Sequence, residues 1–122
     1  MAYNAPFQPK GKTISFTTSG TPSTAQSRQV QASDFGLNNR LPDNLRVVNR
    51  GSADVWISFT EATATIAIPT PGTTTTGTPQ QAICIVPGVV EVFTLPAGPV
   101  LWVNDISTGA SETYHILGGE GS

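Results

Sequence analysis

One histidine and one cysteine are the residues of this 122-residue chain best suited to do chemistry. His115 stands in "ETYHIL", where strand alternation places Tyr114 and Ile116 on one face and His115 on the other. It could act as a general base, but no serine stands in a G-x-S-x-G turn and no second histidine is present to share a metal ion. We therefore expect a surface or hydrogen-bonded histidine, no catalytic residue and no enzyme activity. On this interpretation His115→Ala leaves function intact.

The remaining polar groups show no spacing typical of a cofactor or metal site. Cys84 lies in the apolar run "AICIV", so we expect a small buried hydrophobe, and one cysteine allows neither an internal disulfide nor a thiolate metal site. The acids form no calcium-loop pattern, and "GGEGS" opens no helix that could hold a phosphate. The sequence thus predicts no cofactor and no metal.

Two tryptophans could form a platform for a sugar ring. Trp56 and Trp102 stand in "DVWISF" and "VLWVNDI", and these apolar neighbours favour core packing for both rings. A net charge of −2, with no alternation of basic and aromatic residues, argues against nucleic acid as a partner.

Charge is scarce and unevenly placed along the chain. Charged residues make up 11% of the sequence, against about 25% in an average globular domain, which suggests a neutral surface covered by a partner. The first fifty residues hold six bases and two acids, a formal charge of +4, and the rest holds six acids, −6. Either a basic face meets an acidic surface, including that of a neighbouring copy, or strands from the two halves interleave and the asymmetry vanishes.

Short alternating runs separated by turn residues must position all these side chains. No segment has helical periodicity apart from a candidate turn at residues 33–40, capped by Ser33 or Asp34. No run of about 18 apolar residues predicts a membrane span, and residues 1–12 lack the apolar region of a secretory signal. The runs that predict strands are residues 12–18, 44–49, 54–59, 63–68, 81–86, 89–95, 100–106 and 112–117, with a weaker one at 27–32.

The spacing of these runs favours an all-β fold, an antiparallel β-sandwich of roughly eight strands with a jelly-roll-like arrangement. One domain suffices for this length. We expect its core to hold eight apolar side chains: Ile14, Phe16, Val47, Ile57, Ile66, Ile85, Val92 and Ile116.

Two segments fall outside the sandwich pattern. Residues 69–79, "PTPGTTTTGTP", form an uncharged loop longer than a hairpin needs, here called the tongue. Its β-branched threonines and flanking prolines favour an extended, polyproline-like arm that contacts another protein, although a solvent-exposed flap without a partner is the alternative. Residues 1–11, with Pro6 and Pro9, are expected to form a second arm that lies on a neighbouring subunit, leaving residues 12–122 as the sandwich domain.

Four stretches together resemble a family of small structural proteins of tailed phages, the capsid decoration or cement proteins. They are "NAPFQPKGKTISFT", "LRVVNRGSADVWISF", "AIPTPGT…AICIVPGVVEVFTLP" and "TYHILGGEGS", and they cover most of the chain. The family's proteins are typically β-sandwiches or jelly rolls that bind the outside of the phage head. Tail, fibre and head–tail connector domains use similar folds.

The resemblance implies a virion structural protein on the capsid surface, assembled in the host cytoplasm. It would bind the major capsid protein, bridge shell subunits and form homo-oligomers on the capsid, without nucleic acid or membrane. The alternative is a tail, fibre or connector β-domain, possibly carbohydrate-binding. The residues expected to contact the partner are Tyr3, Phe7, Lys10, Lys12, Thr73, Thr74, Thr75 and Thr76.

Overall fold

The computed structural model describes residues 8–21, 23–38, 40–95 and 100–120. Its strands in chain order are β1 (Gln8–Thr17), β2 (Ser19–Gly20), β3 (Ser23–Thr24), β4 (Gln26–Val30), β5 (Asn44–Asn49), β6 (Val55–Thr60), β7 (Ile83–Ile85), β8 (Val90–Thr94), β9 (Leu101–Ser107) and β10 (Thr113–Glu120). A single 3₁₀ turn, η1 (Ala32–Phe35), follows β4. The described part of the chain is therefore all-β, as the alternating runs predict.

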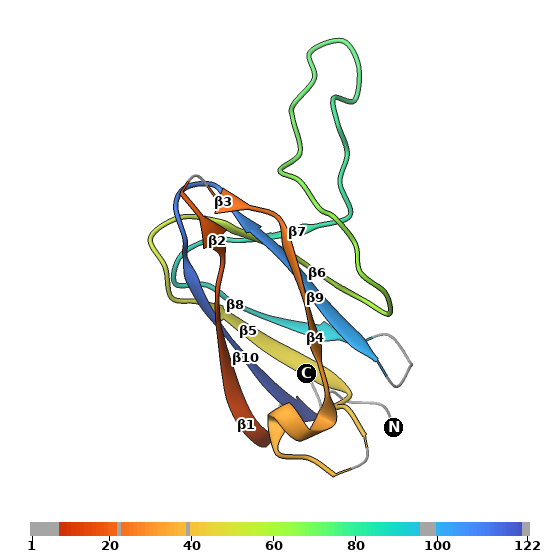
Figure 1. Cartoon of the computed structure of the whole chain (residues 1–122). Coiled ribbons are helices and arrows are strands. Elements are labelled where there is room, and N and C mark those ends of the chain that lie inside the picture. The colour runs from red at the N-terminus through yellow and green to blue at the C-terminus, as the bar shows by residue number, and fades with distance from the viewer. Residues whose placement is uncertain (1–7, 22, 39, 96–99, 121–122) are drawn as a thin grey trace, which may run out of the picture.

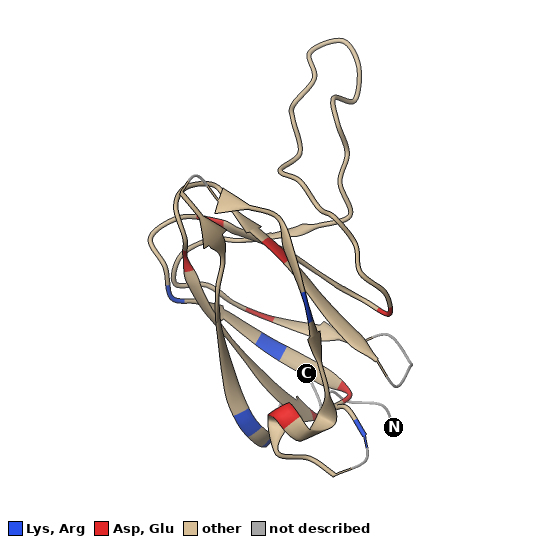
Figure 2. Cartoon of the chain, in the orientation of Figure 1, with Lys and Arg blue, Asp and Glu red and all other residues tan. Residues whose placement is uncertain are grey.

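The strands form two four-stranded antiparallel sheets and one short two-stranded pair (Figure 1). The first sheet has the order β1-β10-β5-β8, the second β4-β9-β6-β7, and β2 pairs with β3. Strands from both halves of the sequence thus lie side by side in each sheet. The charge asymmetry along the sequence is accordingly mixed in space: Lys10 is 2.9 Å from Glu120, and charged residues are scattered over the sandwich (Figure 2).

One apolar core joins the inner faces of the two sheets. Leu45 and Val47 of β5 alternate with Arg46, and Val55 and Ile57 of β6 alternate with Trp56, so every second side chain points inward. The cluster has members from both sheets and from η1: Val30, Phe35, Leu45, Val47, Val55, Ile57, Ile85, Leu101, Val103, Tyr114 and Ile116. This shared core gives the molecule a β-sandwich-like structure.

Most of the expected core residues are buried, and Val92 is not. Val47, Ile57, Ile85 and Ile116 are fully buried and Ile66 is 4% exposed; Ile14 and Phe16 pack on the cluster from its margin. Val92 is 38% exposed, because its register partner is the outward-facing Arg46 and the inward position of β8 belongs to Phe93. The prediction placed Val92 on the inner face of β8, but the inward-facing side chain is that of the next residue, Phe93, so the prediction was wrong.

Two predicted elements differ in kind from what the structure has. Residues 63–68 are not a strand: Ala64 donates its N–H to the side chain of Asn104 and accepts from Ser27, so side chains take the place of a neighbouring strand. The turn predicted at residues 33–40 is η1, whose Asp34 carboxylate accepts the N–H of Gln31 at 2.7 Å. Gln31, and not Ser33 or Asp34, stands at the N-cap.

The expected N-terminal arm is wrong for its described part. Gln8 pairs with Glu120 and Pro9 with Gly119, so β1 already packs on its own domain before residue 11. Gly11 has φ 88°, and a Cβ there would lie 2.2 Å from the carbonyl oxygen of Phe35, which shows how closely the chain approaches η1. Residues 1–7, including Tyr3 and Phe7, lie outside the described residues.

Candidate functional site

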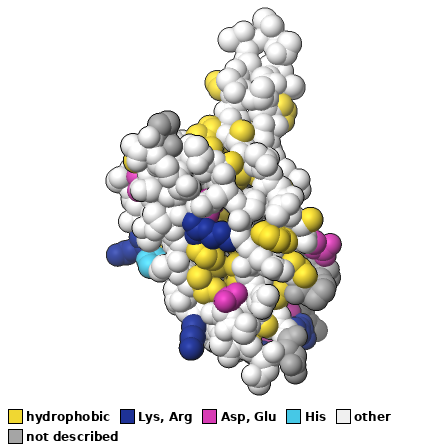
Figure 3. Space-filling view, viewed as in Figure 1, with side chains coloured by type: hydrophobic (Ala, Val, Ile, Leu, Met, Phe, Trp, Pro, Cys, Tyr) yellow, Lys and Arg dark blue, Asp and Glu magenta, His cyan; other side chains and the backbone are white. Residues whose placement is uncertain are grey.

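The tongue stands clear of both sheets (Figure 1). Thr73, Thr74, Thr75 and Thr76 are all exposed at its tip, and no charged residue occurs between Pro69 and Pro79. In the space-filling view this projection shows only apolar and neutral polar groups (Figure 3). The tongue therefore offers a partner a neutral surface rich in backbone groups and hydroxyls.

Two hydrogen bonds join the two sides of the tongue near its base, so the tongue is not the extended arm that we expected. Thr78 donates its N–H to the carbonyl of Thr70 at 3.0 Å, and the Thr78 hydroxyl accepts the N–H of Thr70 at 2.8 Å. Gly77 has φ 68°, and a Cβ on it would lie 2.0 Å from the Thr70 carbonyl oxygen. A Cβ on Gly72 would lie equally close to the carbonyl of Thr75. The two glycines allow the chain to fold back closely, so the tongue is a closed loop.

A second segment, residues 61–68, leads into the tongue and covers the outer face of the β4-β9-β6-β7 sheet; we call it the cover segment. Its anchor is Asn104 of β9, which is fully buried although it points away from the core between the sheets. The Asn104 amide oxygen accepts the Ala64 N–H at 3.2 Å and the Ser27 hydroxyl at 2.6 Å. Its amide nitrogen donates to the Thr60 hydroxyl at 2.8 Å. Asn104, together with the Ser27 hydroxyl that donates to the Ala64 carbonyl, thus ties the cover segment to the sheet.

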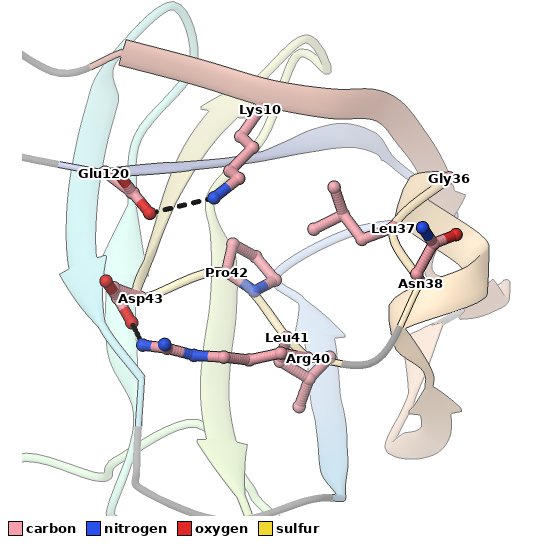
Figure 4. Close-up of a pocket in the computed structure, with 9 residues that line it drawn as sticks. All are labelled: Lys10, Gly36, Leu37, Asn38, Arg40, Leu41, Pro42, Asp43 and Glu120. Carbon is pink, nitrogen blue, oxygen red and sulfur yellow. Dashed lines mark hydrogen bonds and ion pairs between the residues drawn. The ribbon is translucent and has the colours of Figure 1, made fainter.

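Lys10 and Lys12 do not lie with the tongue. Both belong to β1 in the other sheet, and Lys10 forms an ion pair with Glu120 beside a hollow of about 300 Å³ (Figure 4). A second ion pair, Arg40–Asp43 at 2.6 Å, lies on the same hollow. The aliphatic stem of Lys12 lies over Gly36. The structure therefore does not bring the two lysines together with Thr73–Thr76.

His115 lies half-buried on the outer face of the β1-β10-β5-β8 sheet. Its Nδ1 is 2.5 Å from the Ser15 hydroxyl, across the β1–β10 register. A hollow of about 250 Å³ beside it is lined by Thr13, Arg46, Val48, Arg50, His115 and Leu117. No carboxylate is among the described residues that line this hollow, so it offers cations and apolar surface but no acid to orient the imidazole.

Cys84 and the tryptophans are less buried than we expected. Cys84 is half-buried on the edge strand β7, where burial raises the pKa of its thiol and Asp54 raises it further. Its register partner Trp56, and Trp102 on β9, are also half-buried and alternate with core residues, so both rings face the outer side of their sheet. The indole N–H of Trp56 is buried without a hydrogen-bond partner in the described structure. Core packing between the sheets was the wrong prediction for both tryptophans.

The interior holds a polar pair, Tyr114 and Asp105, that the sequence pattern did not indicate. The Tyr114 hydroxyl donates to Asp105, which also accepts from Gln26 at 3.0 Å. Burial raises the pKa of Asp105, against the lowering effects of the hydrogen bonds from Tyr114 and Gln26 and of the nearby Arg28. Burial likewise raises the pKa of Tyr114 well above its ordinary value, and Asp105 raises it further. This pair is enclosed by the sandwich and serves its packing.

Metal-binding clusters and membrane-spanning helices are absent from the residues that the structure describes. There, no three His, Cys, Asp or Glu side chains lie close enough together to hold a metal ion. No described helix has the length and apolar character needed to cross a bilayer. No protein-family model, curated protein or solved structure matches this chain.

Proposed function

We propose that this protein is a virion structural protein, a capsid decoration or cement protein that binds the outside of a phage head and bridges shell subunits. The observation that carries the proposal is the tongue, an uncharged loop that is closed by its Thr70–Thr78 bridge and stands clear of the sandwich. A neutral loop loses no ion hydration when a partner covers it, and its backbone groups are available for hydrogen bonding.

The order of the strands supports a jelly roll, the finer fold within this proposal. In chain order the strands of the two sheets alternate except at β6 and β7, which follow each other in the same sheet: β1, β5, β8 and β10 lie in one sheet, and β4, β6, β7 and β9 in the other. Eight strands divided in this way are typical of double-sheet jelly rolls, which recur among viral capsid proteins and lectins. Fold alone does not fix function, so the tongue remains the argument for capsid binding.

On a head, the partner is the major capsid protein and many copies of this chain occupy equivalent positions. A copy that touches two shell subunits gains from effective concentration, so two weak contacts act together as one strong contact. The carbohydrate-binding alternative receives less support, because it needs an exposed ring for stacking and both Trp56 and Trp102 are half-buried.

Removal of the tongue tests the proposal. Replacing residues 71–77 with Asn-Gly joins Thr70 to Thr78 by a two-residue turn that suits paired strands, so the bridge and the sandwich are kept. Heads lacking the protein are incubated with wild-type or shortened protein, pelleted, and assayed for bound protein. We expect wild type to bind and the shortened variant to lose at least about tenfold in affinity, the equivalent of about 1.4 kcal/mol.

Raising the salt concentration distinguishes binding through the neutral tongue from binding through ion pairs. Charge contacts at a surface are screened over about 8–10 Å at physiological ionic strength, whereas apolar and backbone contacts are not. We expect bound wild-type protein to stay on heads in 0.5 M NaCl, and the thermal unfolding of the free shortened variant to match that of wild type. Virions that contain none of this protein would end the proposal, and a shortened variant that binds normally would end the role of the tongue.

A further inference from the structure

A hollow opens into the core of the sandwich on the side where β7 and β8 lie. Its volume is about 400 Å³, and it is lined by residues of β6 and β8 and by the chain that leads into β7: Ile57, Ser58, Phe59, Gln80, Gln81, Ala82, Ile83, Phe93 and Thr94. Ile57 is fully buried in the core, whereas Ile83 is 50% exposed. The hollow therefore has a floor of core side chains and an apolar side chain open to solvent at its margin.

Two phenylalanines from opposite sheets form much of its apolar surface. Phe59 of β6 and Phe93 of β8 have ring centroids 5.4 Å apart and ring planes tilted by 56°. Both rings are partly buried and pack on the core cluster. None of the nine described residues that line the hollow carries a charge. A charged group placed there would lose water without gaining an ionic partner, so the hollow suits a neutral occupant.

The backbone of β6 determines which groups face this hollow. The N–H of Thr108 donates to the carbonyl of Asp54 at 3.0 Å, and these two residues extend the β6–β9 register by one hydrogen-bonded pair. Hydrogen-bonded and non-hydrogen-bonded pairs alternate along an antiparallel ladder. Val55, Ile57 and Phe59 therefore direct their N–H and C=O groups away from β9, toward the side of β7.

Pairing with β7 stops before it reaches Phe59. The register of β7 ends at the pair of Ile57 and Ile83, two residues short of Phe59. Residues 80–82 line the hollow but do not belong to a strand. Among the described residues, Phe59 thus has no strand partner on this side. Its N–H and C=O lie where a continuation of β7 would bind them.

This geometry favours an extended peptide segment as the occupant. One residue of an added antiparallel strand can exchange two hydrogen bonds with Phe59, as in strand addition at a sheet edge. Directly opposite residues of paired strands place their side chains on the same face, and Phe59 faces the core. The added residue therefore points its own side chain into the hollow. A volume of about 400 Å³ lies near the lower end of the range for ligand pockets, about 300–1,000 Å³, and accommodates one large side chain.

We propose that this hollow binds an extended, neutral segment of a partner protein, which adds a short strand beside Phe59 and inserts one large apolar side chain against Phe59, Phe93 and Ile83. The site adjoins the tongue, because residues 80–82 join Pro79 to the start of β7, and both surfaces are neutral. On the proposed function one partner, the shell protein, covers both surfaces. Strand addition at Phe59 does not depend on the identity of that partner.

A titration followed by ¹H–¹⁵N NMR tests the proposal with three blocked peptides. The probe is Ac-Thr-Phe-Thr-NH₂. One control has Ala in place of Phe, and the other carries a methyl group on the Phe nitrogen, which removes the donor for the Phe59 carbonyl. We expect the probe, at about 1–10 mM, to shift the amide signals of residues 57–59, 81–83 and 93–94 and to slow hydrogen exchange at the Phe59 amide. Each control should bind more than about fivefold more weakly.

Two matched glutamine substitutions locate the site. Gln81→Trp places a ring at the exposed margin of the hollow and should weaken binding of the probe more than about tenfold. Gln29→Trp makes the same change at an exposed position of β4, on the opposite edge of the same sheet, and should weaken it less than about twofold. If thermal unfolding shows that Gln81→Trp does not fold, Ile83→Ala replaces it, with an expected loss of about threefold or more.

Any of four results overturns the proposal: no shift with the probe, shifts centred outside the hollow, equal binding of either control peptide, or wild-type binding by Gln81→Trp. Tighter binding of p-cresol than of the probe would also overturn it, because the hollow would then be a small-molecule site. The variant in which Asn-Gly replaces residues 71–77 should bind the probe as wild type does, and loss of binding in that variant would assign the site to the tongue instead. None of these measurements uses phage heads, so this proposal and the proposed function fail or succeed separately.

Discussion

The outer faces of the two sheets differ in what lies over them in the described structure. On the β4-β9-β6-β7 sheet, Asn104, Ser27 and Thr60 bind one another and the backbone of the cover segment. On the β1-β10-β5-β8 sheet, the outward side chains beside His115 are Ser15 and Val48, and the hydrogen bonds of these described residues hold no segment across them. Among the described residues, similar alternation therefore yields a sheet face with or without a segment bound across it, depending on whether a polar side chain is placed to satisfy a crossing backbone.

Shortening the buried side chain of the cover segment should have the largest effect on stability. Ile66 is 4% exposed but does not belong to the cluster between the sheets, so it is buried only while the cover segment stays in place on the sheet. We expect Ile66→Ala to lower the free energy of unfolding by about 2–5 kcal/mol. Val92→Ala, on the open face, should stay within about 0.5 kcal/mol. Urea unfolding measures both, and equal losses would contradict the contrast between the faces.

Removing the anchor of the cover segment should come next. Asn104→Ala leaves the Ala64 N–H and the Thr60 hydroxyl without their buried partner, at a cost of about 1–3 kcal/mol. Ser15→Ala is the matched change on the open face, where loss of the bond to His115 should cost less than about 0.5 kcal/mol.

Hydrogen exchange adds a local measurement to this pair. In Asn104→Ala the Ala64 amide should exchange faster by more than the loss of global stability explains, because its acceptor is gone. Unchanged protection at Ala64 would mean that Asn104 does not hold the cover segment.

The smallest expected effect on stability concerns Asp105 in the interior of the sandwich, and it depends on pH. Because the folded-state pKa of Asp105 is raised, the folded protein keeps a proton that the unfolded chain releases. The resulting stability is fully present below the unfolded pKa of about 3.9 and is lost as pH rises through the folded pKa. We expect the free energy of unfolding to fall over this range, by about 1.4 kcal/mol for every tenfold by which folding tightens proton binding to the carboxylate. Asp105→Asn should remove that slope, and a slope that survives in this variant would assign it to another group.

The sequence allowed the positions of the strands to be predicted better than which strands and segments lie next to one another. Alternation located β5, β6 and β10 correctly, since local spacing decides which side chains share a face. The same signal failed at residues 63–68, because a segment that lies across a sheet can bury Ile66 without pairing with a strand. It failed at Val92 because β8 is apolar at both parities, and only its pairing with β5 selects Phe93 for the core.

Neither candidate surface was predictable in full. The composition of residues 69–79 indicated the tongue, but its closure depends on the pairing of Thr70 with Thr78. The contact between Ser15 and His115 on the outer face of the β1-β10-β5-β8 sheet was not predicted at all, because residues 100 positions apart become neighbours only when β1 pairs with β10. Long-range register carries no local signal in one sequence.

The central place of β10 has a consequence for how the protein is made. This strand, the last that the structure describes, lies between β1 and β5, so the β1-β10-β5-β8 sheet cannot close during synthesis until Thr113–Glu120 have left the ribosome. Until then β1 and β5 have edges without their native partner. Closure of this sheet therefore requires β10 to enter between two strands that precede it in the sequence by more than 60 residues.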